Sequence, residues 1–188
     1  AEASPNSPSV SSADYELRDI VGEGGVGIVF SARQSSFNRD VAVKMIRGDK
    51  VDDAKRNELV AEAVTTGDLE HPNIIPVHDL GMDEKGDLFY SMKRVQGDPW
   101  SKLITKNTLG ENIQIFMKVA DAVAFAHAEG IIHRDLKPEN VMIGAFGEVL
   151  VMDWGLANRF ETRADGSTRG QPCCRGGTPA YMAPEMLL

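Results

Sequence analysis

A ten-residue stretch, Ile131–Asn140, carries three side chains that could act together on a phosphate group. Asp135 can accept a proton, Lys137 can neutralise an anion, and Asn140 offers a neutral oxygen of the kind that Mg²⁺ accepts as a ligand. Pro138 disfavours a helix through this segment and predicts a loop. Read alone, this spacing is also compatible with a charged surface turn. The interpretation as a phosphoryl-transfer site therefore depends on the rest of the chain.

A second candidate metal ligand lies downstream, in the tripeptide Asp153–Gly155. The apolar runs 141–143 and 148–152 predict a short hairpin that ends at this tripeptide. A carboxylate at the end of a buried strand is a suitable ligand for Mg²⁺. Asn140 and Asp153 are therefore the predicted metal ligands.

A glycine cluster with strand-forming residues on both sides lies between Val21 and Val29. Gly22, Gly24 and Gly27 follow the pattern G-x-G-x-x-G-x-V, which predicts a hairpin whose backbone N–H groups can approach an anion. The pattern alone is weak evidence because glycine turns are common. A strand and not a helix follows the glycines, which disfavours a dinucleotide-binding fold.

Lys44 lies in the middle of an alternating segment, 41–46, that predicts a strand. A solvent-facing lysine is one interpretation of such a position. The glycine hairpin just before it favours another, in which Lys44 contacts the α- and β-phosphates of ATP. An acidic partner for this lysine is expected from the helix predicted over 52–66, which offers Glu58 and Glu62.

The remaining regular elements can also be predicted from the sequence. Strands are expected over 75–80 and 88–93. Thr108 and Glu111 form a capping box that begins a helix ending near Gly130. Side chains at steps of three and four residues predict one face of this helix: Ile113, Phe116, Ala120, Val123 and His127.

Composition excludes several classes of protein. With 188 residues the chain can form one substantial core or two small lobes. The formal net charge of −8 argues against nucleic-acid binding, and no apolar run is long enough for a membrane span. The two cysteines, Cys173 and Cys174, are adjacent, which predicts free thiols in a reducing, cytoplasmic compartment. A membrane anchor outside this sequence is compatible with that prediction.

Taken together, residues 15–185 resemble a serine/threonine protein kinase of the eukaryotic-like type that is common in bacteria. The run 133–140 matches the catalytic loop H-R-D-L-K-P-E-N of that family. Asp153 begins a D-F-G motif in which Trp154 replaces phenylalanine, and Ala183–Glu185 matches A-P-E. The joint occurrence of these motifs in the expected order is more specific than any one of them.

This resemblance implies an α+β, bilobal protein-kinase-like fold over residues 14–188. An N-lobe with an antiparallel sheet and the family's helix C is expected over about 14–95, and a partial helical C-lobe over about 96–188. Residues 1–13, rich in Ser, Pro and Ala, are predicted to form a disordered tail. Because kinase domains continue past A-P-E, the chain is expected to be a truncated domain.

The resemblance also assigns a role to each catalytic candidate. Asp135 would orient the substrate hydroxyl and accept its proton, and Lys137 would offset charge on the phosphoryl group. Asn140 and Asp153 would hold Mg²⁺, with Mn²⁺ as an alternative. Lys137 together with Gly177-Thr178-Pro179 follows the Ser/Thr version of the motif, in which Thr178 bonds to Asp135 and Lys137.

A set of nucleotide-binding residues follows in the same way. Glu62 is favoured over Glu58 as the partner of Lys44 because of its spacing to the segment 71–74. Met92 takes the gatekeeper position, and 93–95 forms a hinge whose Lys-Arg pair departs from the usual acidic-aromatic pair. The predicted ATP-binding set comprises Val21, Gly22, Gly24, Gly27, Val29, Ala42, Lys44, Glu62, Met92, Val95 and Met142.

The implied activity is ATP-dependent phosphorylation of serine or threonine in protein substrates. A nucleotide-binding pseudokinase scaffold is the alternative, which the presence of Lys44, Asp135 and Asp153 disfavours. A third interpretation is a truncated chain that is inactive on its own. No nucleic-acid partner is expected, whereas a dimer would allow phosphorylation in trans.

The polar segment 158–175 has the composition of a mobile activation segment, and Ser167 and Thr168 are its candidate phosphorylation sites. Arg134 and Arg159 are expected to be unneutralised cations close to one loop. A phosphate between them would replace repulsion with charge-assisted hydrogen bonds. Phosphorylation is therefore expected to order the segment.

Overall fold

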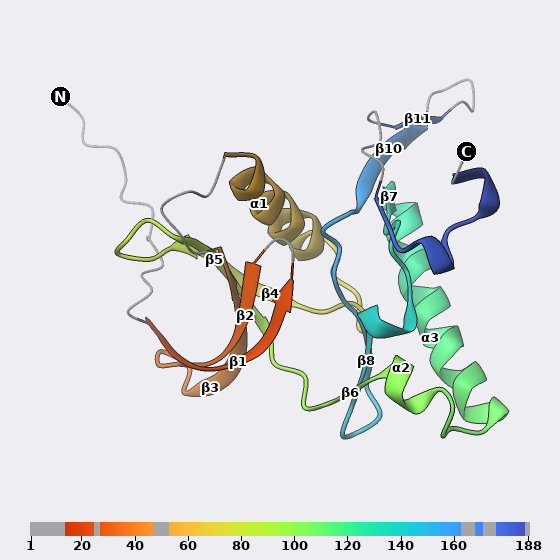
Figure 1. Ribbon diagram of the computed structural model, residues 1–188, viewed down its shortest axis with the longest axis horizontal. Helices are drawn as coiled ribbons and strands as arrows, with labels where there is room; N and C mark the ends of the chain where they lie inside the picture. Colours follow the sequence, from red (N-terminus) through yellow and green to blue (C-terminus); the bar gives the residue numbers. More distant parts are fainter. Residues whose placement is uncertain (1–13, 25–26, 47–52, 163–167, 171–175, 187–188) are drawn as a thin grey trace. The chain divides into compact units, whose positions relative to one another are not determined.

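The computed structural model of the protein describes residues 14–24, 27–46, 53–162, 168–170 and 176–186 (Figure 1). The tail predicted at the N-terminus lies outside the described residues. Among the described residues no helix has both the length and the apolar character needed to cross a membrane. The mixture of sheets and helices confirms the expected α+β class.

The described chain divides into two compact units. The first comprises 14–63 together with 77–94, and the second comprises 64–76 together with the residues from Val95 onward. The segment 64–76, which includes the end of the helix expected over 52–66, belongs to the second unit.

The first unit is built on a five-stranded antiparallel sheet with the strand order β1-β2-β3-β5-β4 (Figure 1). The strand predicted over 88–93 is β5, with the same bounds. The strand predicted over 75–80 is β4, which begins two residues later than expected, at Val77. The strands are β1 (Tyr15–Gly24), β2 (Gly27–Gln34), β3 (Arg39–Met45), β4 (Val77–Met82) and β5 (Leu88–Lys93).

Alternation along β3 decides which side chains enter the core of the first unit. Val41, Val43 and Met45 are buried on one face of the sheet, where they pack with Phe30 and Phe89. The residues between them point to the opposite face, because successive side chains of a strand alternate. The strand therefore presents Lys44 on the face away from this core.

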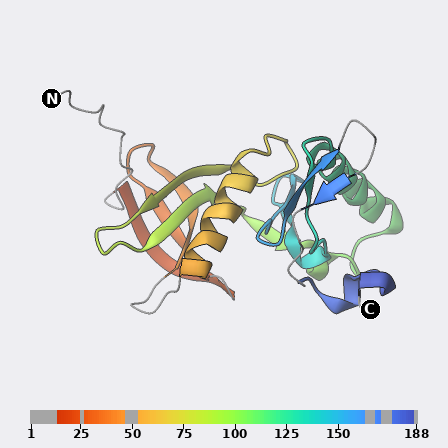
Figure 2. The ribbon, with the colours of Figure 1, turned by 90° about the horizontal axis from the view of Figure 1, so that it is seen from above.

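Helix α1 (Asp53–Gly67) follows β3 and confirms the helix predicted over 52–66. Asp53 lies in its first turn, where a negative charge favours the helix N-terminus. Leu59, Ala63 and Thr66 are buried on one face, as their spacing predicts. Figure 2 shows the length of this helix beside the strands.

The second unit contains two small three-stranded sheets and one long helix. One sheet has the order β6-β8-β9 and the other the order β11-β10-β7. The helices are α2 (Trp100–Leu103) and α3 (Leu109–Ala128), with 3₁₀ turns η2 (Pro138–Asn140), η3 (Pro179–Tyr181) and η4 (Pro184–Met186). The strands are β6 (Gly97–Pro99), β7 (Ile131–Ile132), β8 (Val141–Gly144), β9 (Val149–Val151), β10 (Asn158–Thr162) and β11 (Thr168–Gly170).

The capping box predicted at the start of α3 is present. The Thr108 hydroxyl accepts the backbone N–H of Glu111 at 3.3 Å, and the Glu111 carboxylate accepts the backbone N–H of Thr108 at 2.7 Å. The Thr108 hydroxyl also donates to the Glu111 carboxylate at 2.8 Å, and the two bonds that this carboxylate accepts, from the backbone and the side chain of Thr108, hold the pKa of Glu111 below its usual value. The helix ends at Ala128, two residues before Gly130.

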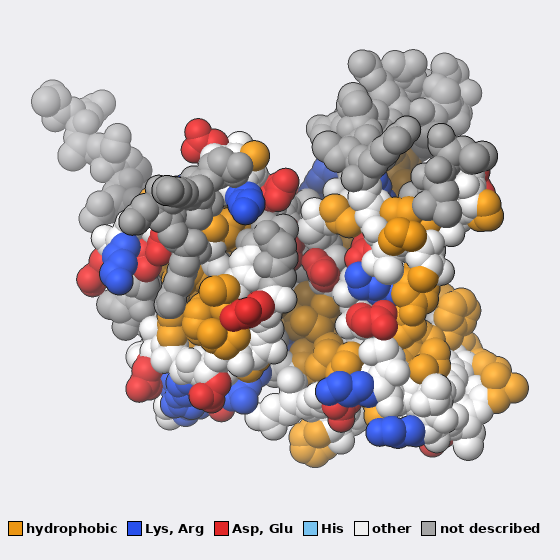
Figure 3. Space-filling view, in the orientation of Figure 1, with side chains coloured by type: hydrophobic (Ala, Val, Ile, Leu, Met, Phe, Trp, Pro, Cys, Tyr) orange, Lys and Arg blue, Asp and Glu red, His pale blue; other side chains and the backbone are white. Residues whose placement is uncertain are grey.

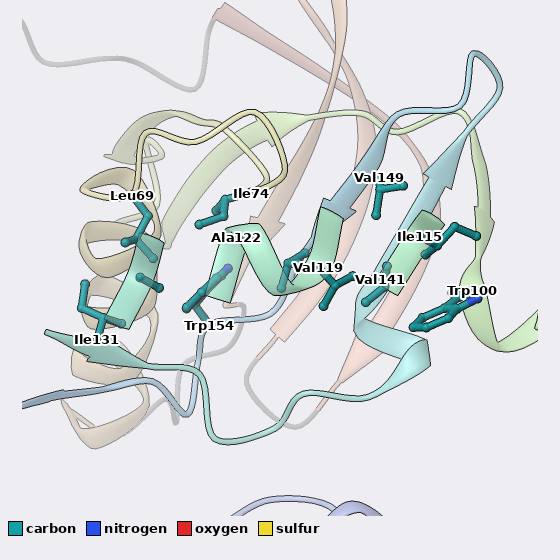
Figure 4. Packing of buried hydrophobic residues seen from close by; sticks show 12 residues of the cluster. Leu69, Ile74, Trp100, Ile115, Val119, Ala122, Ile131, Val141, Val149 and Trp154 are labelled. Atoms are coloured by element: carbon teal, nitrogen blue, oxygen red, sulfur yellow. The ribbon is translucent and has the colours of Figure 1, made fainter. Parts of the chain in front are cut away.

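The face of α3 that was predicted from residue spacing is wrong for most of its members, although Val123 does pack against the core. Ile113 and Phe116 are exposed, whereas the buried side chains are Ile115, Val119, Ala122 and Ala126. This buried row packs with residues of β7, β8 and β9 and with Trp154 (Figure 4). Both rows of α3 are apolar, so periodicity alone could not choose between them. The exposed row leaves hydrophobic side chains on the surface over α3 (Figure 3).

Regular structure also occurs within the segment expected to be mobile. Strand β10 pairs with β7 through Asn158↔Ile132 and with β11 through Phe160↔Gly170. The backbone N–H of Phe160 donates to the Gly130 carbonyl at 2.8 Å. Gly130 has φ +73°, and a Cβ atom there would lie 2.7 Å from the Phe160 carbonyl oxygen, so this close approach requires glycine. The polar composition of 158–175 predicted a mobile segment. Composition says nothing about which strands a backbone will pair with, so it could not predict the pairing with β7 and β11.

Candidate active site

His133 anchors the catalytic loop of the second unit, immediately after β7. Its side chain is buried, and its Nε2 lies 2.9 Å from the Met152 carbonyl oxygen. The backbone N–H of Asp135 donates to His133 Nδ1 at 3.3 Å. The accepting Nδ1 assigns the ring proton to Nε2, which donates to Met152. Burial lowers the pKa of His133, so the ring is a neutral structural support for the loop.

Two residues of the site have left-handed backbone conformations that are uncommon for side chains other than glycine. Arg134 has φ +69° and Asp153 has φ +62°. Such conformations cost about 1–3 kcal/mol each and persist where the surrounding structure enforces them. Arg134 directly precedes the predicted base Asp135, and Asp153 is itself a predicted metal ligand, which makes this strain a structural sign of a functional site.

Asp135, Lys137 and Thr178 form a closed triangle of hydrogen bonds. Lys137 Nζ lies 2.7 Å from Asp135 Oδ2 and 2.8 Å from Thr178 Oγ1. The Thr178 hydroxyl donates to Asp135 Oδ1 at 2.7 Å. Partial burial raises the pKa of Asp135, but the hydrogen bonds from Lys137 and Thr178 outweigh it, and the pKa lies below its usual value. Asp135 is therefore a carboxylate held in one orientation.

Asn140 lies at the end of the same loop, in the turn η2. The loop predicted around Pro138 contains this short 3₁₀ turn, which proline tolerates at its first position because that N–H needs no partner in the turn. Asn140 Nδ2 donates to the Asp135 carbonyl at 2.9 Å and approaches Asp135 Oδ2 at 3.3 Å. With the amide nitrogen used in this way, Oδ1 is left as an acceptor.

The oxygen atoms of Asn140 and Asp153 fit a hard divalent cation. They supply one amide oxygen and one carboxylate, which are ligand types that Mg²⁺ accepts. Within the described residues, no group of three His, Cys, Asp or Glu side chains could hold a metal alone. This donor set therefore fits an ion that takes its remaining ligands from phosphate and water oxygens.

Trp154 fills the interior next to the metal-ligand candidate Asp153. It is 1% exposed, and its ring centroid lies 4.6 Å from that of His133. Figure 4 shows Trp154 within the same cluster as Leu69, Ile74 and Ile131. Its Nε1 has no hydrogen-bond partner among the described residues. The side chain therefore packs well but leaves a buried donor unsatisfied.

The expectation that Arg159 is an unneutralised cation is wrong. Its guanidinium pairs with the carboxylate of Asp68, a residue that directly follows α1. Arg134 Nη1 donates a hydrogen bond to the Leu156 carbonyl oxygen at 3.4 Å. Of the two phosphorylation candidates, Ser167 lies outside the described residues, and only the backbone of Thr168 is described, in β11.

The first unit holds the predicted phosphate-binding lysine. Lys44 Nζ lies 2.7 Å from each carboxylate oxygen of Glu62. The Tyr90 hydroxyl donates to Glu62 Oε1 at 2.7 Å, and Glu62 is buried. Glu58, the competing candidate, is exposed on α1. Sequence reasoning missed Tyr90, because a tyrosine in a strand gives no signal that its hydroxyl meets a carboxylate.

The glycine hairpin of the first unit is closed by backbone pairing. Gly24 pairs with Gly27 and Gly22 with Val29 in the β1–β2 register. Gly27 has φ +154°, and a Cβ atom there would lie 2.7 Å from the Met45 carbonyl oxygen. The close approach of β3 therefore requires glycine at this position.

Other members of the predicted ATP-binding set are spread over both units. Ala42 pairs with the buried Met92 in the β3–β5 register. Val21 is exposed on β1. Val95 and Met142 belong to the second unit. The structure thus brings together Lys44 with Glu62 in the first unit and, separately, the catalytic loop residues in the second.

Comparison with known proteins identifies relatives of this chain. The sequence matches the family described as protein kinase domain over residues 15–188. The serine/threonine-protein kinase PknD of Protochlamydia amoebophila is 34% identical over 203 residues, which cover 93% of this chain and 21% of that protein. PknD of Chlamydia muridarum is 36% identical over 207 residues, which cover 93% of this chain and 22% of that protein. The chain thus spans 21–22% of the length of these curated relatives.

Proposed function

Because the chain belongs to the protein kinase family, we propose that it transfers the γ-phosphoryl group of ATP to serine or threonine hydroxyls of proteins. The observation that carries this proposal is the triangle of Asp135, Lys137 and Thr178. It joins a carboxylate, a cation and a hydroxyl from two segments of the chain in one fixed arrangement. The names of the relatives support serine and threonine as acceptors.

Asp135 orients the substrate hydroxyl and receives its proton. The hydroxyl oxygen forms a bond to the γ-phosphorus while the bond from that phosphorus to the bridging oxygen of ADP breaks. Lys137 offsets the negative charge on the transferring phosphoryl oxygens. This reaction requires little covalent chemistry from the protein, so positioning and charge stabilisation provide most of the rate enhancement.

Asn140 and Asp153 hold Mg²⁺ in this proposal, with Mn²⁺ as the alternative metal. A bound divalent ion neutralises charge on the nucleotide phosphates. Lys44, which Glu62 fixes by a two-oxygen ion pair, binds the α- and β-phosphates. The remaining members of the predicted ATP-binding set complete the nucleotide contacts.

Regulation by phosphorylation of Ser167 or Thr168 is part of the same proposal. A second copy of the chain is then one protein substrate, which a dimer would present in trans. Because Arg159 is already paired with Asp68, a phosphate near it has to compete with that carboxylate. Arg134 is the cation that adjoins Asp135 directly.

The proposal is tested by incubating the chain with Mg²⁺ and ATP labelled at the γ-position, together with a general protein acceptor. Acid hydrolysis of the labelled acceptor should release phosphoserine and phosphothreonine. Asp153→Ala should abolish Mg²⁺-dependent nucleotide binding and with it the transfer. A chain that binds Mg-ATP but labels no protein would contradict the proposal and leave a nucleotide-binding scaffold.

A further inference from the structure

The first unit contains a small cavity that the proposed reaction does not use. Its volume is about 130 Å³. Five of its six lining residues are apolar or aromatic, and the sixth is acidic. The lining consists of Tyr15, Leu17, Val43, Met45, Asp83 and Phe89.

The cavity lies on the core face of the sheet. Val43 and Met45 are two residues apart on β3 and so share a face, and Met45 pairs directly with Phe89 of β5. Lys44 lies between them on β3 and points to the opposite face, where it meets Glu62. A ligand in the cavity would therefore leave the Lys44–Glu62 ion pair untouched.

Tyr15 builds one wall of the cavity by joining the two edge strands of the sheet. Its hydroxyl donates to the Asp79 carboxylate on β4 and lies 3.0 Å from Ser91 Oγ. Gln34 Nε2 donates to the same hydroxyl at 3.1 Å. The Tyr15 ring packs edge-on against Phe89 with centroids 5.4 Å apart. Because three partners hold the hydroxyl, the wall is preformed and Tyr15 contributes chiefly aromatic surface.

Asp83 gives the lining its only charge. One oxygen, Oδ1, accepts the backbone N–H groups of Lys85 at 2.9 Å and Asp87 at 2.8 Å. No described residue donates to the other oxygen, Oδ2. The turn 83–87 carries three carboxylates and one lysine, and the Arg56 guanidinium donates to its Gly86 carbonyl at 3.4 Å, so the turn with this arginine has a formal charge of −1. The electrostatic environment of this lining therefore favours a cation over an anion.

We propose that this cavity is a binding site for a small arylalkylammonium group, with the ring in the apolar part and the ammonium at Asp83. The volume is suited to one six-membered ring, since an apolar cavity of about 150 Å³ holds benzene. Small-molecule sites commonly combine such apolar walls with a few polar groups. The inference does not depend on kinase activity.

Benzylamine is the probe, and binding is measured by titration of methyl resonances in NMR spectra of the chain. Shifts should be concentrated at Leu17, Val43 and Met45. Benzyl alcohol should bind more weakly than benzylamine, and phenylacetate more weakly still, because Asp83 repels its carboxylate. Shifts spread over the chain, or no saturable shift at the three methyl-bearing residues, would overturn the proposal.

Two variants separate the contributions of the ring and the charge. Asp83→Asn retains an Oδ1 acceptor for the backbone N–H groups of the turn. It should weaken the affinity for benzylamine about three- to fivefold and leave the affinity for benzyl alcohol unchanged. Glu84→Gln removes the same charge one residue away and is the matched control, with a smaller effect. Leu17→Phe should fill the cavity and block both probes. Equal benzylamine affinity in Asp83→Asn and Glu84→Gln would contradict the assigned role of Asp83. This comparison does not depend on whether Leu17→Phe folds.

Discussion

The hydroxyl of Thr178 donates a 2.7 Å hydrogen bond to Oδ1 of Asp135, across 43 residues of sequence. The same hydroxyl accepts from Lys137 at 2.8 Å. The Thr178 side chain therefore links the segment that precedes Ala183–Glu185 to Asp135, the predicted base. Asp135 owes both its orientation and part of its lowered pKa to this link.

Replacing Thr178 by alanine should lower kcat about tenfold, because a hydrogen bond that positions the base is lost. Thr178→Ser keeps a hydroxyl and should retain most of the rate. Loss of this donor also raises the pKa of Asp135 toward its usual value, so the acid limb of the pH–rate profile should move to higher pH. Equal rates and pH profiles for the alanine and serine variants would show that the hydroxyl is dispensable.

Replacing Lys44 and replacing Glu62 should lower the free energy of unfolding by different amounts, because the two partners of this ion pair are buried to different extents. The Glu62 side chain is 1% exposed and that of Lys44 is 13% exposed. Lys44→Met removes the ammonium group from the buried Glu62 carboxylate, which still accepts from the Tyr90 hydroxyl, and should lower the free energy of unfolding by about 3 kcal/mol. Glu62→Gln is neutral and still accepts from Tyr90, so its cost should be about 1 kcal/mol. Urea unfolding checks both values, and equal costs would contradict this account.

The two tryptophans of the chain form a matched pair for testing the unsatisfied indole N–H. Trp100 Nε1 donates to Asn112 Oδ1 at 2.8 Å, whereas Trp154 Nε1 has no partner among the described residues. Replacement by phenylalanine removes the same volume from each buried site. Trp100→Phe also loses a hydrogen bond, whereas Trp154→Phe removes an unsatisfied donor. Trp100→Phe should therefore be more destabilising by about 1–3 kcal/mol in urea unfolding. The reverse order would contradict this interpretation.

The raised pKa of Tyr15 predicts that the protein loses stability at alkaline pH. Burial and the hydrogen bond to Asp79 raise the pKa of Tyr15 from 10.0 to about 12. The folded state therefore holds this proton more tightly than the unfolded state does. Its contribution is complete below pH 10 and is lost as the pH rises toward 12, by on the order of 2 kcal/mol. Unfolding free energies of the wild type and Tyr15→Phe should converge over this window. A constant difference would contradict the assigned pKa.

Much of the fold could be predicted from local patterns. The capping box at Thr108 and the alternation along β3 depend on neighbouring residues, and both are present in the structure. The buried face of α3 was missed because the helix has two apolar rows and tertiary contacts decide between them. Strand β10 was missed for a related reason, since its partners are the backbone of β7 and of β11.

The same distinction between local sequence patterns and tertiary contacts applies to the site. The spacing of Asp135, Lys137 and Asn140 predicted a phosphoryl-transfer site, because these residues are close in sequence. The pairing of Arg159 with Asp68 joins residues 91 positions apart, and no local pattern indicates it. The Tyr90 hydroxyl on Glu62 is likewise a product of the fold. Contacts across the chain therefore had to come from the structure.

The central claim is that Asp135 is the base of a phosphoryl-transfer site. Its most direct test is the single-turnover rate of phosphate transfer from Mg-ATP for the wild type and Asp135→Asn, with the dissociation constant of Mg-ATP measured in parallel. Asparagine preserves the shape of the side chain and removes the proton acceptor. The rate should fall by about two to four orders of magnitude while the dissociation constant stays within about twofold. A near-normal rate in Asp135→Asn would contradict the claim.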